Sequence, residues 1–456
     1  MKCKLISLLT VLILPTHISQ GQNNITVSLD VEKIPELGFV ISSQRSEMTS
    51  MEFSANGHAK YQLENTDAVY LTLHNGFSER KMIYAEQGDH IQLSFDGASM
   101  AKTLKMKGVR QSIADYLEKV NLAKLESQDY ALELQAFSSL LKDKVISNQH
   151  LLDSCQNSLS KESSKFVKIE SNRIKYTMAL CLLDYPRHHS QITKNNYIPK
   201  EDYYEILAKW AEEDEDLLCL WEYRTFMTEI PAIIINDGKT DHTSYEKALQ
   251  QMESINSYFK NERVKQSLLT IIANEYIKSK GILESKELDH FFRQHVKSKD
   301  LLAQYLSIYD SWATVAPGQL APEFKATDPS GKEHSLKDFR GQYVCLYLWP
   351  NINPCIQEFS HLEKLRPLFK KKNITLVNLS IDKNEKAWQE IIQNKELQVG
   401  IHLYSGFDRE LLRRYHYNPG HMFQFTLIDP NGKIIELHAP APSSGMENFI
   451  QTTTWQ

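Results

Sequence analysis

The sequence predicts a multidomain α+β protein, with a β-rich N-terminal part, a helical middle and an α/β C-terminal part. The period of the apolar residues changes from two to a helical spacing near residue 109, and long apolar runs typical of buried strands appear after residue 314. With 456 residues, 41% of them hydrophobic and 24% charged, the chain can form several cores and has the composition of a soluble globular protein. We expect three domains, residues 22–108, 109–313 and 314–456.

The first 21 residues have the features of a signal peptide. Lys2 and Lys4 provide the positive start, residues 5–14 the apolar segment, and residues 19–21 the small residues before a cleavage site. Cys3 precedes the apolar segment, so it is not the lipid-bearing cysteine of a lipoprotein signal. No other run is long and apolar enough to span a membrane. We therefore expect an exported, periplasmic protein that is soluble after cleavage.

The N-terminal and middle parts show strands followed by helices. Alternating or β-branched runs at 25–29, 68–73 and 91–95 predict short strands in a small antiparallel sandwich or barrel. Apolar stripes such as Leu268, Ile272 and Tyr276 predict helices from residue 109 to about 310. Breaks are expected at Pro186, Pro199 and Pro231, with a loop at 236–238.

The C-terminal part alternates strands and helices. A boundary segment at 317–324 and a hairpin turn at 328–332 precede an apolar strand at 343–349. A helix should follow, with Asn353 as its N-cap and Pro354 at its first position. A second buried strand is expected at 374–382, and a closing hairpin at 426–435 turns at Asn431-Gly432.

Two motifs carry a resemblance to a known family. Gly318-x-x-Ala-Pro-x-Phe324 and Pro354-Cys355-x-x-Glu358 resemble the opening and the active-site helix of TlpA/ResA-like thioredoxin-fold domains and their AhpC/TSA relatives. The resemblance implies a thioredoxin-like α/β domain and thiol-disulfide chemistry at a Cys-x-Pro-Cys motif, with Glu358 matching the family's proton-transfer carboxylate. The order of elements before Gly108 resembles the β-domain that often precedes such domains.

The chain departs from the family at two positions of the active site. Ile352 stands where the first, nucleophilic cysteine is expected, so the dithiol reaction loses its attacking thiolate. The cis-proline of the fold is expected near Phe423, and no proline occurs there. Because a non-proline cis bond costs roughly 3 kcal/mol, we expect a trans, reshaped loop, unless Pro419 takes the role in a shifted register. The sequence thus predicts a degenerate redox site.

These departures leave two functions open. The first is a non-redox binding or scaffold module for a protein or peptide at the thioredoxin-like face, with Ile352 and Phe423 forming an apolar contact. The second is a thiol-disulfide oxidoreductase, or antioxidant-type protein, acting through one thiol. The candidate catalytic residues are Cys355 and Glu358, and the candidate binding residues are Trp349, Ile352, Asn353, Pro354 and Phe423.

Other classes of function are disfavoured. A peroxidase ranks last, because the family's peroxidases need a Thr or Ser at position 352 and an Arg near 423. A net charge of -5 without a basic stripe argues against nucleic acid. No cofactor motif or metal-ligand spacing stands out, so neither is predicted. The expected mature chain keeps five cysteines, Cys155, Cys181, Cys219, Cys345 and Cys355, of which the first four are expected to pack in cores.

Overall fold

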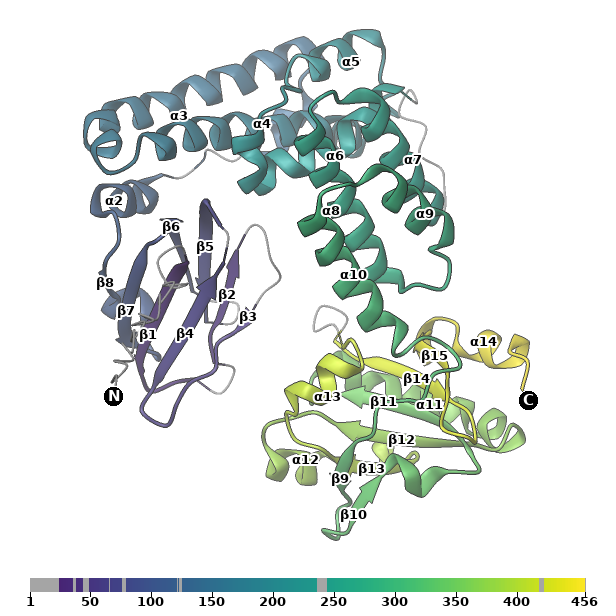
Figure 1. The fold of residues 1–456 in the computed structure, drawn as a ribbon. Helices are drawn as coiled ribbons and strands as arrows, with labels where there is room; N and C mark the ends of the chain where they lie inside the picture. Colours follow the sequence, from purple (N-terminus) through teal and green to yellow (C-terminus); the bar gives the residue numbers. More distant parts are fainter. Residues whose placement is uncertain are drawn as a thin grey trace, which may run out of the picture. The chain divides into compact units, whose positions relative to one another are not determined.

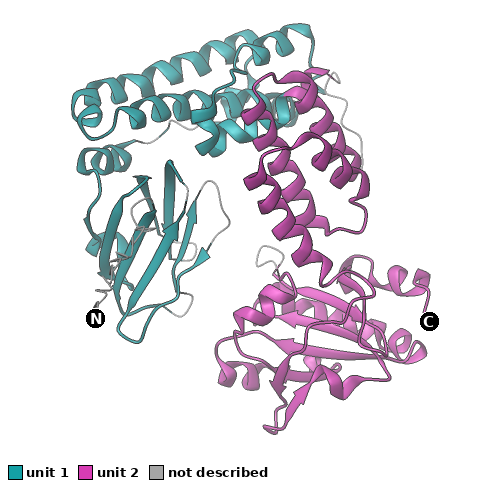
Figure 2. Cartoon of the chain, viewed as in Figure 1, with its two compact units in different colours: residues 1–230 teal, residues 231–456 magenta. Residues whose placement is uncertain are grey.

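The protein divides into two compact units in a computed structural model. The structure describes residues 24–455 except 36–37, 44–48, 65, 76–78, 121, 123–124, 236–243 and 418–421. The predicted signal peptide, the predicted loop at 236–238 and Pro419 therefore lie outside the described residues. The units are residues 1–230 and 231–456, and the division falls within helix α6 (Figure 2).

The first unit begins with two four-stranded sheets (Figure 1). Their orders are β4-β1-β7-β8, in which β1 and β7 run parallel, and β3-β2-β5-β6, which is antiparallel throughout. The prediction of an antiparallel arrangement is therefore wrong for the first of these sheets. Buried side chains of both sheets, from Ile25 to Met100, form one hydrophobic cluster. The predicted strands at 25–29, 68–73 and 91–95 lie within β1, β5 and β7. The strands are β1 (Ile25–Glu32), β2 (Val40–Ser43), β3 (Thr49–Ser50), β4 (His58–Leu63), β5 (Ala68–His74), β6 (Arg80–Glu86), β7 (His90–Asp96) and β8 (Lys105–Lys107).

Helices make up most of the rest of this unit. They are α1 (Met100–Thr103), α2 (Gln111–Lys119), α3 (Leu134–Glu162), α4 (Ser164–Thr193), α5 (Glu201–Ala208) and α6 (Trp221–Ile235). The predicted break at Pro199 is confirmed, but those at Pro186 and Pro231 are wrong, because α4 and α6 continue through both prolines. A proline leaves the carbonyl four residues earlier without its helical donor. At Pro186 the Tyr203 hydroxyl replaces it, donating to Leu182 O at 3.3 Å.

A buried carboxylate joins the sheets to the helices within this unit. Glu170 on α4 is fully buried and forms a two-point ion pair with Arg173, with N–O distances of 2.6 and 2.7 Å. It also accepts hydrogen bonds from the Tyr70 hydroxyl on β5 at 2.5 Å and the Tyr116 hydroxyl on α2 at 3.1 Å. One side chain thus connects three elements.

The second unit begins with four helices, α7 (Ser244–Tyr258), α8 (Glu262–Lys280), α9 (Lys286–His295) and α10 (Lys299–Ala313). The predicted stripe is confirmed in α8, where Leu268, Ile272 and Tyr276 are buried. At the end of α10, Trp312 stacks on His416 with ring centroids 4.2 Å apart. This contact packs α10 against the α/β part of the same unit.

A seven-stranded mixed sheet forms the α/β part. Its order is β10-β9-β13-β12-β11-β14-β15, with β11, β12 and β13 parallel at the centre. The strands are β9 (Lys325–Thr327), β10 (Glu333–Ser335), β11 (Tyr343–Trp349), β12 (Ile374–Ser380), β13 (Ile401–Tyr404), β14 (Gln424–Ile428) and β15 (Ile434–Ala439). The turns predicted at 328–332 and at Asn431-Gly432 join β9 to β10 and β14 to β15.

Helices cover both faces of this sheet (Figure 1). α11 (Asn353–Lys371), α12 (Glu385–Ile391) and α14 (Met446–Thr452) pack on the face that Cys345, Tyr347 and Trp349 present. α13 (Arg409–Arg414) lies against the other face. The thioredoxin-like arrangement predicted for the C-terminal part of the chain is thus present.

The segment that leads from α10 into the sheet pairs with the turn before β15 and with the first residue of that strand. Gly318 N donates to Ile434 O at 2.8 Å, Ile434 N donates to Gln319 O at 2.8 Å, and Ala321 N donates to Gly432 O at 2.9 Å. The backbone of residues 318–321 therefore takes part in the hydrogen bonding of the last strand.

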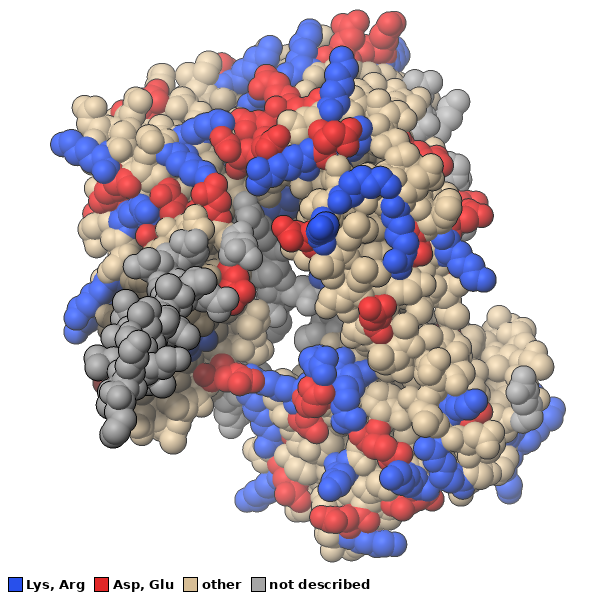
Figure 3. Space-filling view, viewed as in Figure 1, with Lys and Arg blue, Asp and Glu red and all other residues tan. Residues whose placement is uncertain are grey.

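Acidic and basic side chains are interspersed on the face drawn in Figure 3. In the part of the chain that the structure describes, no helix has both the length and the apolar character needed to cross a membrane. The same residues hold no cluster of three or more His, Cys, Asp or Glu arranged for a metal ion.

Candidate functional site

The site is built on the connection from β11 to α11, at the edge where the parallel strands end. Trp349 pairs with Ser380 and Ser380 with Tyr404, so the carboxyl ends of β11, β12 and β13 lie side by side. In open α/β sheets this edge is where ligands bind. The continuous apolar run of β11 suits its central place, because β12 and β14 flank it and helices cover both faces.

The helix begins one residue earlier than predicted. Asn353 is the first residue of α11 and Ile352 is the N-cap, so the prediction of Asn353 as the cap is wrong. Ile352 has no side-chain acceptor, and the Cys355 and Ile356 amides instead donate to its own carbonyl at 3.0 and 3.1 Å. Pro354 remains in the first turn, where its missing N–H costs no hydrogen bond.

Cys355 is a buried thiol. Its exposed fraction is 0%, and Sγ donates weakly to Met422 O at 3.7 Å. The Tyr347 hydroxyl donates to Cys355 O at 2.7 Å and the Tyr417 hydroxyl to Met422 O at 2.6 Å, which fixes the backbone on both sides of the sulfur. Burial, with the nearby charge of Asp382 as the next cause, raises the pKa of Cys355 to about 12. The dipole at the start of α11 does not overcome this burial.

Glu358 lies one turn further along α11 and is also buried, with 6% of its surface exposed. The Ser443 hydroxyl donates to its Oε1 at 2.5 Å, and the Ser443 backbone N–H donates to Oε2 at 3.1 Å. Glu358 is therefore not a solvated glutamate of the helix surface. Both oxygens of the carboxylate are engaged by one residue from the segment that precedes α14.

Asp382 follows β12 and holds the loop before α11. The backbone N–H of Asn351 donates to both of its oxygens, at 2.9 and 3.0 Å, and the Ser380 hydroxyl donates to Oδ2 at 2.9 Å. Burial raises the pKa of Asp382, and these two donors act in the opposite direction.

Aromatic rings support the site from within the sheet. Tyr347 stacks on Phe425 at 4.2 Å, and Phe423, which is half-buried, lies edge-on to both at about 6 Å. Trp349 is fully buried and meets Phe359 of α11 edge-on at 5.1 Å. Of the predicted binding residues, Trp349 thus lies in the core beneath the site.

The surface of the site is apolar. Ile352 is 41% exposed and Met422 is 44% exposed, and Asn353 and Pro354 are also exposed. Phe407, which follows β13 at the same edge of the sheet, is 42% exposed. The Met422–Phe423 peptide bond is trans, and Met422 has a φ of +62°.

Several of these residues gave no signal in the sequence. Ser443 is 85 residues from Glu358, and Met422 and Tyr417 act through a backbone carbonyl and a hydroxyl. Asp382 is the exception, because a polar residue that follows a buried parallel strand is a pattern typical of a binding site. The cysteines Cys155, Cys181, Cys219, Cys345 and Cys355 form no disulfide. Cys219 and Cys345 are buried as predicted, whereas Cys155 and Cys181 are half-buried.

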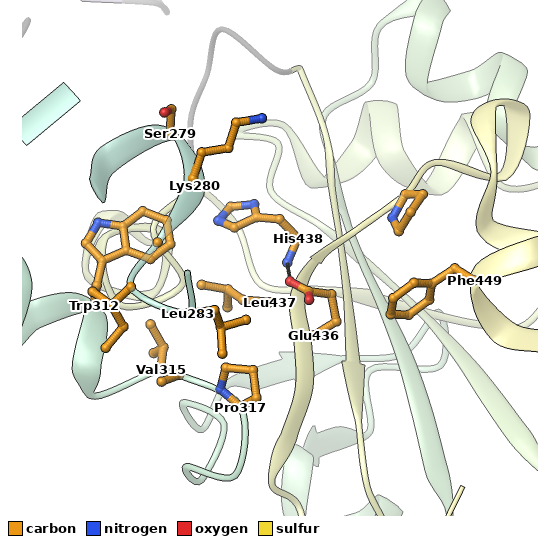
Figure 4. Close-up of a pocket in the computed structure, with 14 residues that line it drawn as sticks. Ser279, Lys280, Leu283, Trp312, Val315, Pro317, Glu436, Leu437, His438 and Phe449 are labelled. Carbon is orange, nitrogen blue, oxygen red and sulfur yellow. Dashed lines mark hydrogen bonds between the residues drawn. The ribbon is translucent and has the colours of Figure 1, made fainter. Parts of the chain in front are cut away.

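A separate pocket of about 330 Å³ lies where α8 and α10 meet β15 (Figure 4). Trp312, Leu283 and Pro317 form its apolar wall, while Lys280 and His438 border it. None of the candidate catalytic or binding residues lines this pocket, so it is distinct from the site at Cys355.

Comparisons with known proteins match the C-terminal part. The model of the AhpC/TSA family matches residues 317–437. Thiol-disulfide oxidoreductase ResA of Bacillus thuringiensis is 29% identical over 139 residues, which are 30% of this chain and 78% of ResA. A Helicobacter pylori protein described as a peroxiredoxin, bcp, is 33% identical over 106 residues, which are 21% of this chain and 69% of that protein.

A solved structure gives a similar match. The thioredoxin domain of a thiol-disulfide oxidoreductase from Bacteroides vulgatus is 26% identical and matches 30% of this chain and 99% of that domain, with a TM-score of 0.28. The sequence matches to the AhpC/TSA family and to ResA confirm the predicted resemblance to TlpA/ResA-like and AhpC/TSA proteins. Through residues 317–437, the chain belongs to the AhpC/TSA family and is a relative of the ResA-like thiol-disulfide oxidoreductases.

Proposed function

We propose that the thioredoxin-like domain is a non-redox binding module whose dithiol site has degenerated. The observation that carries this proposal is the burial of Cys355, the one cysteine at the site, beneath the Met422 carbonyl. A thiol-disulfide reaction needs an accessible thiolate. Burial raises the pKa of Cys355 to about 12, so this thiol is protonated at neutral pH.

The residue at the nucleophile position supports the same proposal. Ile352 is exposed where the family carries its attacking cysteine, and its side chain has no group that forms or breaks a disulfide. The other cysteine in this part of the sheet is Cys345, which is fully buried inside β11 and whose pKa burial raises. Neither thiol is presented to a substrate.

The ligand that fits this surface is a protein or peptide with an apolar side chain. Ile352, Met422 and Phe407 are partly exposed around the ends of the parallel strands, and Asn353 supplies polar groups beside them. Apolar residues rimmed by polar ones are typical of protein interaction sites. No cofactor or metal enters this proposal.

The competing function is a one-cysteine oxidoreductase that acts through Cys355, with Glu358 as the proton-transfer group. The fully engaged Glu358 carboxylate weighs against it, because Ser443 already donates to both oxygens.

Alkylation of the native protein separates the two functions. Iodoacetamide labelling of each cysteine is followed by mass spectrometry from pH 6 to pH 10, with the half-buried Cys155 as internal reference and urea-unfolded protein as the control. The binding module predicts that Cys355 is labelled far more slowly than Cys155 until the chain unfolds. Fast labelling of Cys355 with a midpoint well below the free-thiol value of about 8.5 would establish the oxidoreductase instead.

The predicted export and domain layout are part of the same proposal. We infer a periplasmic protein released after residue 21, with domains at 22–108, 109–313 and 314–456. Sequencing the N-terminus of the protein recovered from the periplasm tests the cleavage position. Limited proteolysis near residues 108 and 313 tests the two boundaries.

A further inference from the structure

The loop between β11 and α11 is held from the end of β12. Ile381 N donates to Trp349 O at 3.1 Å, which extends the pairing of the two strands by one bond. The Asp382 carboxylate then accepts the Asn351 N–H with both oxygens. The loop closes on itself immediately afterwards, where Ile352 N donates to Pro350 O at 2.8 Å.

This loop decides where α11 begins and therefore where Cys355 lies. The Ile352 carbonyl, directly after the residue that Asp382 holds, accepts the amides of Cys355 and Ile356. A shift of Asn351 would be transmitted to the first turn of the helix. The carboxylate of Asp382 thus fixes the thiol through two consecutive sets of backbone hydrogen bonds.

Asp382 also places a half-buried negative charge near the sulfur. The other ionisable groups around Cys355 are Glu358 from α11, Tyr347 from β11 and Tyr417 from the segment after α13. Ser443 donates two hydrogen bonds to Glu358, and both tyrosines have pKa values raised by burial, so they are neutral at physiological pH. Among these groups, Asp382 has the largest effect after burial in raising the pKa of Cys355.

We propose that Asp382 is a positioning residue that keeps Cys355 unreactive, by fixing loop 350–352, from which the helix that carries the thiol begins, and by opposing a second negative charge beside the sulfur. This inference rests on the proposed function, in which Cys355 is retained as an unreactive thiol. Asp382 lies outside the Pro354-Cys355-x-x-Glu358 motif.

Two substitutions separate the charge from the hydrogen bonds. Asp382→Asn removes the charge but keeps an oxygen that accepts the Asn351 N–H, whereas Asp382→Ala removes both. Asp408→Asn is the matched control, because Asp408 is an exposed carboxylate that caps α13 by accepting Leu411 N at 3.0 Å. Asparagine is an equally good cap there, so this variant changes charge alone.

The measurement is the pH profile of iodoacetamide alkylation at Cys355 in the full-length protein. Removing a neighbouring like charge favours the thiolate, so Asp382→Asn should speed the labelling of Cys355 in the folded protein at pH 8 about threefold relative to the wild type. Asp382→Ala should speed the labelling of Cys355 further, because the loop also loses the hydrogen bonds from Asn351 N–H to the carboxylate. Asp408→Asn should follow the wild type.

The outcomes distinguish this inference from the proposed function. The inference is overturned if the Asp382→Asn profile coincides with the wild-type profile, or if Asp408→Asn moves by the same amount. Fast wild-type labelling at low pH would instead refute the binding-module proposal, while the difference between Asp382→Asn and wild type still decides the role of Asp382. Circular dichroism checks that each variant is folded, and Asp382→Asn, the milder change, remains decisive if Asp382→Ala unfolds.

Discussion

Replacing Glu170 by glutamine should selectively weaken the first unit. The substitution leaves the Arg173 guanidinium, whose side chain is 7% exposed, without its two-point carboxylate partner. It also removes the charged acceptor for the hydroxyls of Tyr70 and Tyr116. These donors come from β5 and α2, so their loss loosens the attachment of the sheets to α4.

The magnitude follows from the cost of an uncompensated buried charge. Breaking a buried ion pair from one side typically costs about 3–5 kcal/mol. Glu222 supplies a second carboxylate close to Arg173, and its own pKa is raised by burial. Because Glu222 partly compensates the guanidinium, we expect the lower end of the range, about 3 kcal/mol.

Hydrogen exchange read peptide by peptide reports on the first unit alone. A loss of about 3 kcal/mol corresponds to exchange on the order of 100-fold faster for the protected amides of α4 and β5. Asp184→Asn is the control, because the Asp184–Arg187 pair lies on the same helix at 3.0 Å but is more than half exposed, and such pairs contribute about 0–1 kcal/mol. Exchange of Glu170→Gln within about threefold of the wild type would refute this reasoning.

Three further predictions concern the second unit. Burial raises the pKa of Cys355 from its ordinary 9.0 to about 12, so above pH 9 the folded protein retains a proton that the unfolded chain loses. The free energy of unfolding of the wild type, measured relative to Cys355→Ala by urea unfolding, should therefore fall above pH 9 by up to about 1.4 kcal/mol per pH unit. A difference that stays constant with pH would contradict this. Ile352→Cys restores a second thiol and should form a disulfide with Cys355 under mild oxidation, seen as a loss of two alkylation sites, whereas Ile352→Ser should not. Gly432→Ala should lower the free energy of unfolding by about 1–2 kcal/mol, because Gly432 has a φ of +75°, and by more because the added methyl group displaces the Arg340 side chain. Gly331 has a similar φ but open space around it, so Gly331→Ala should lower the melting temperature less.

The C-terminal sheet could be predicted from local pattern because its central strands are apolar on both faces. The strand predicted at 343–349 is β11 residue for residue, and the one predicted at 374–382 contains β12. The Asn431-Gly432 turn was also correct, because Gly432 occupies the positive φ that such a turn demands. In these cases the residues that determine the structure lie within a few positions of each other.

Features that depend on distant residues could not be predicted in this way. Pro186 predicts a helix break on its own, and the Tyr203 hydroxyl that compensates it lies on another helix. The engagement of Glu358 depends on Ser443, which comes close only after the whole sheet has formed. The family motif identified Cys355 and Glu358, but the pKa of the thiol depends on burial and on Asp382.

The backbone pairing of residues 318–321 with β15 also decides how the C-terminal domain can be isolated. An open strand edge presents unpaired amides and carbonyls that recruit strands from other molecules. A shortened protein beginning at residue 323, just before β9, would leave the backbone groups of Gly432 and Ile434 without these partners and should aggregate at high concentration. A protein beginning at residue 314 retains residues 318–321 and should stay monomeric. The segment after α10 therefore protects the domain from association through strand pairing.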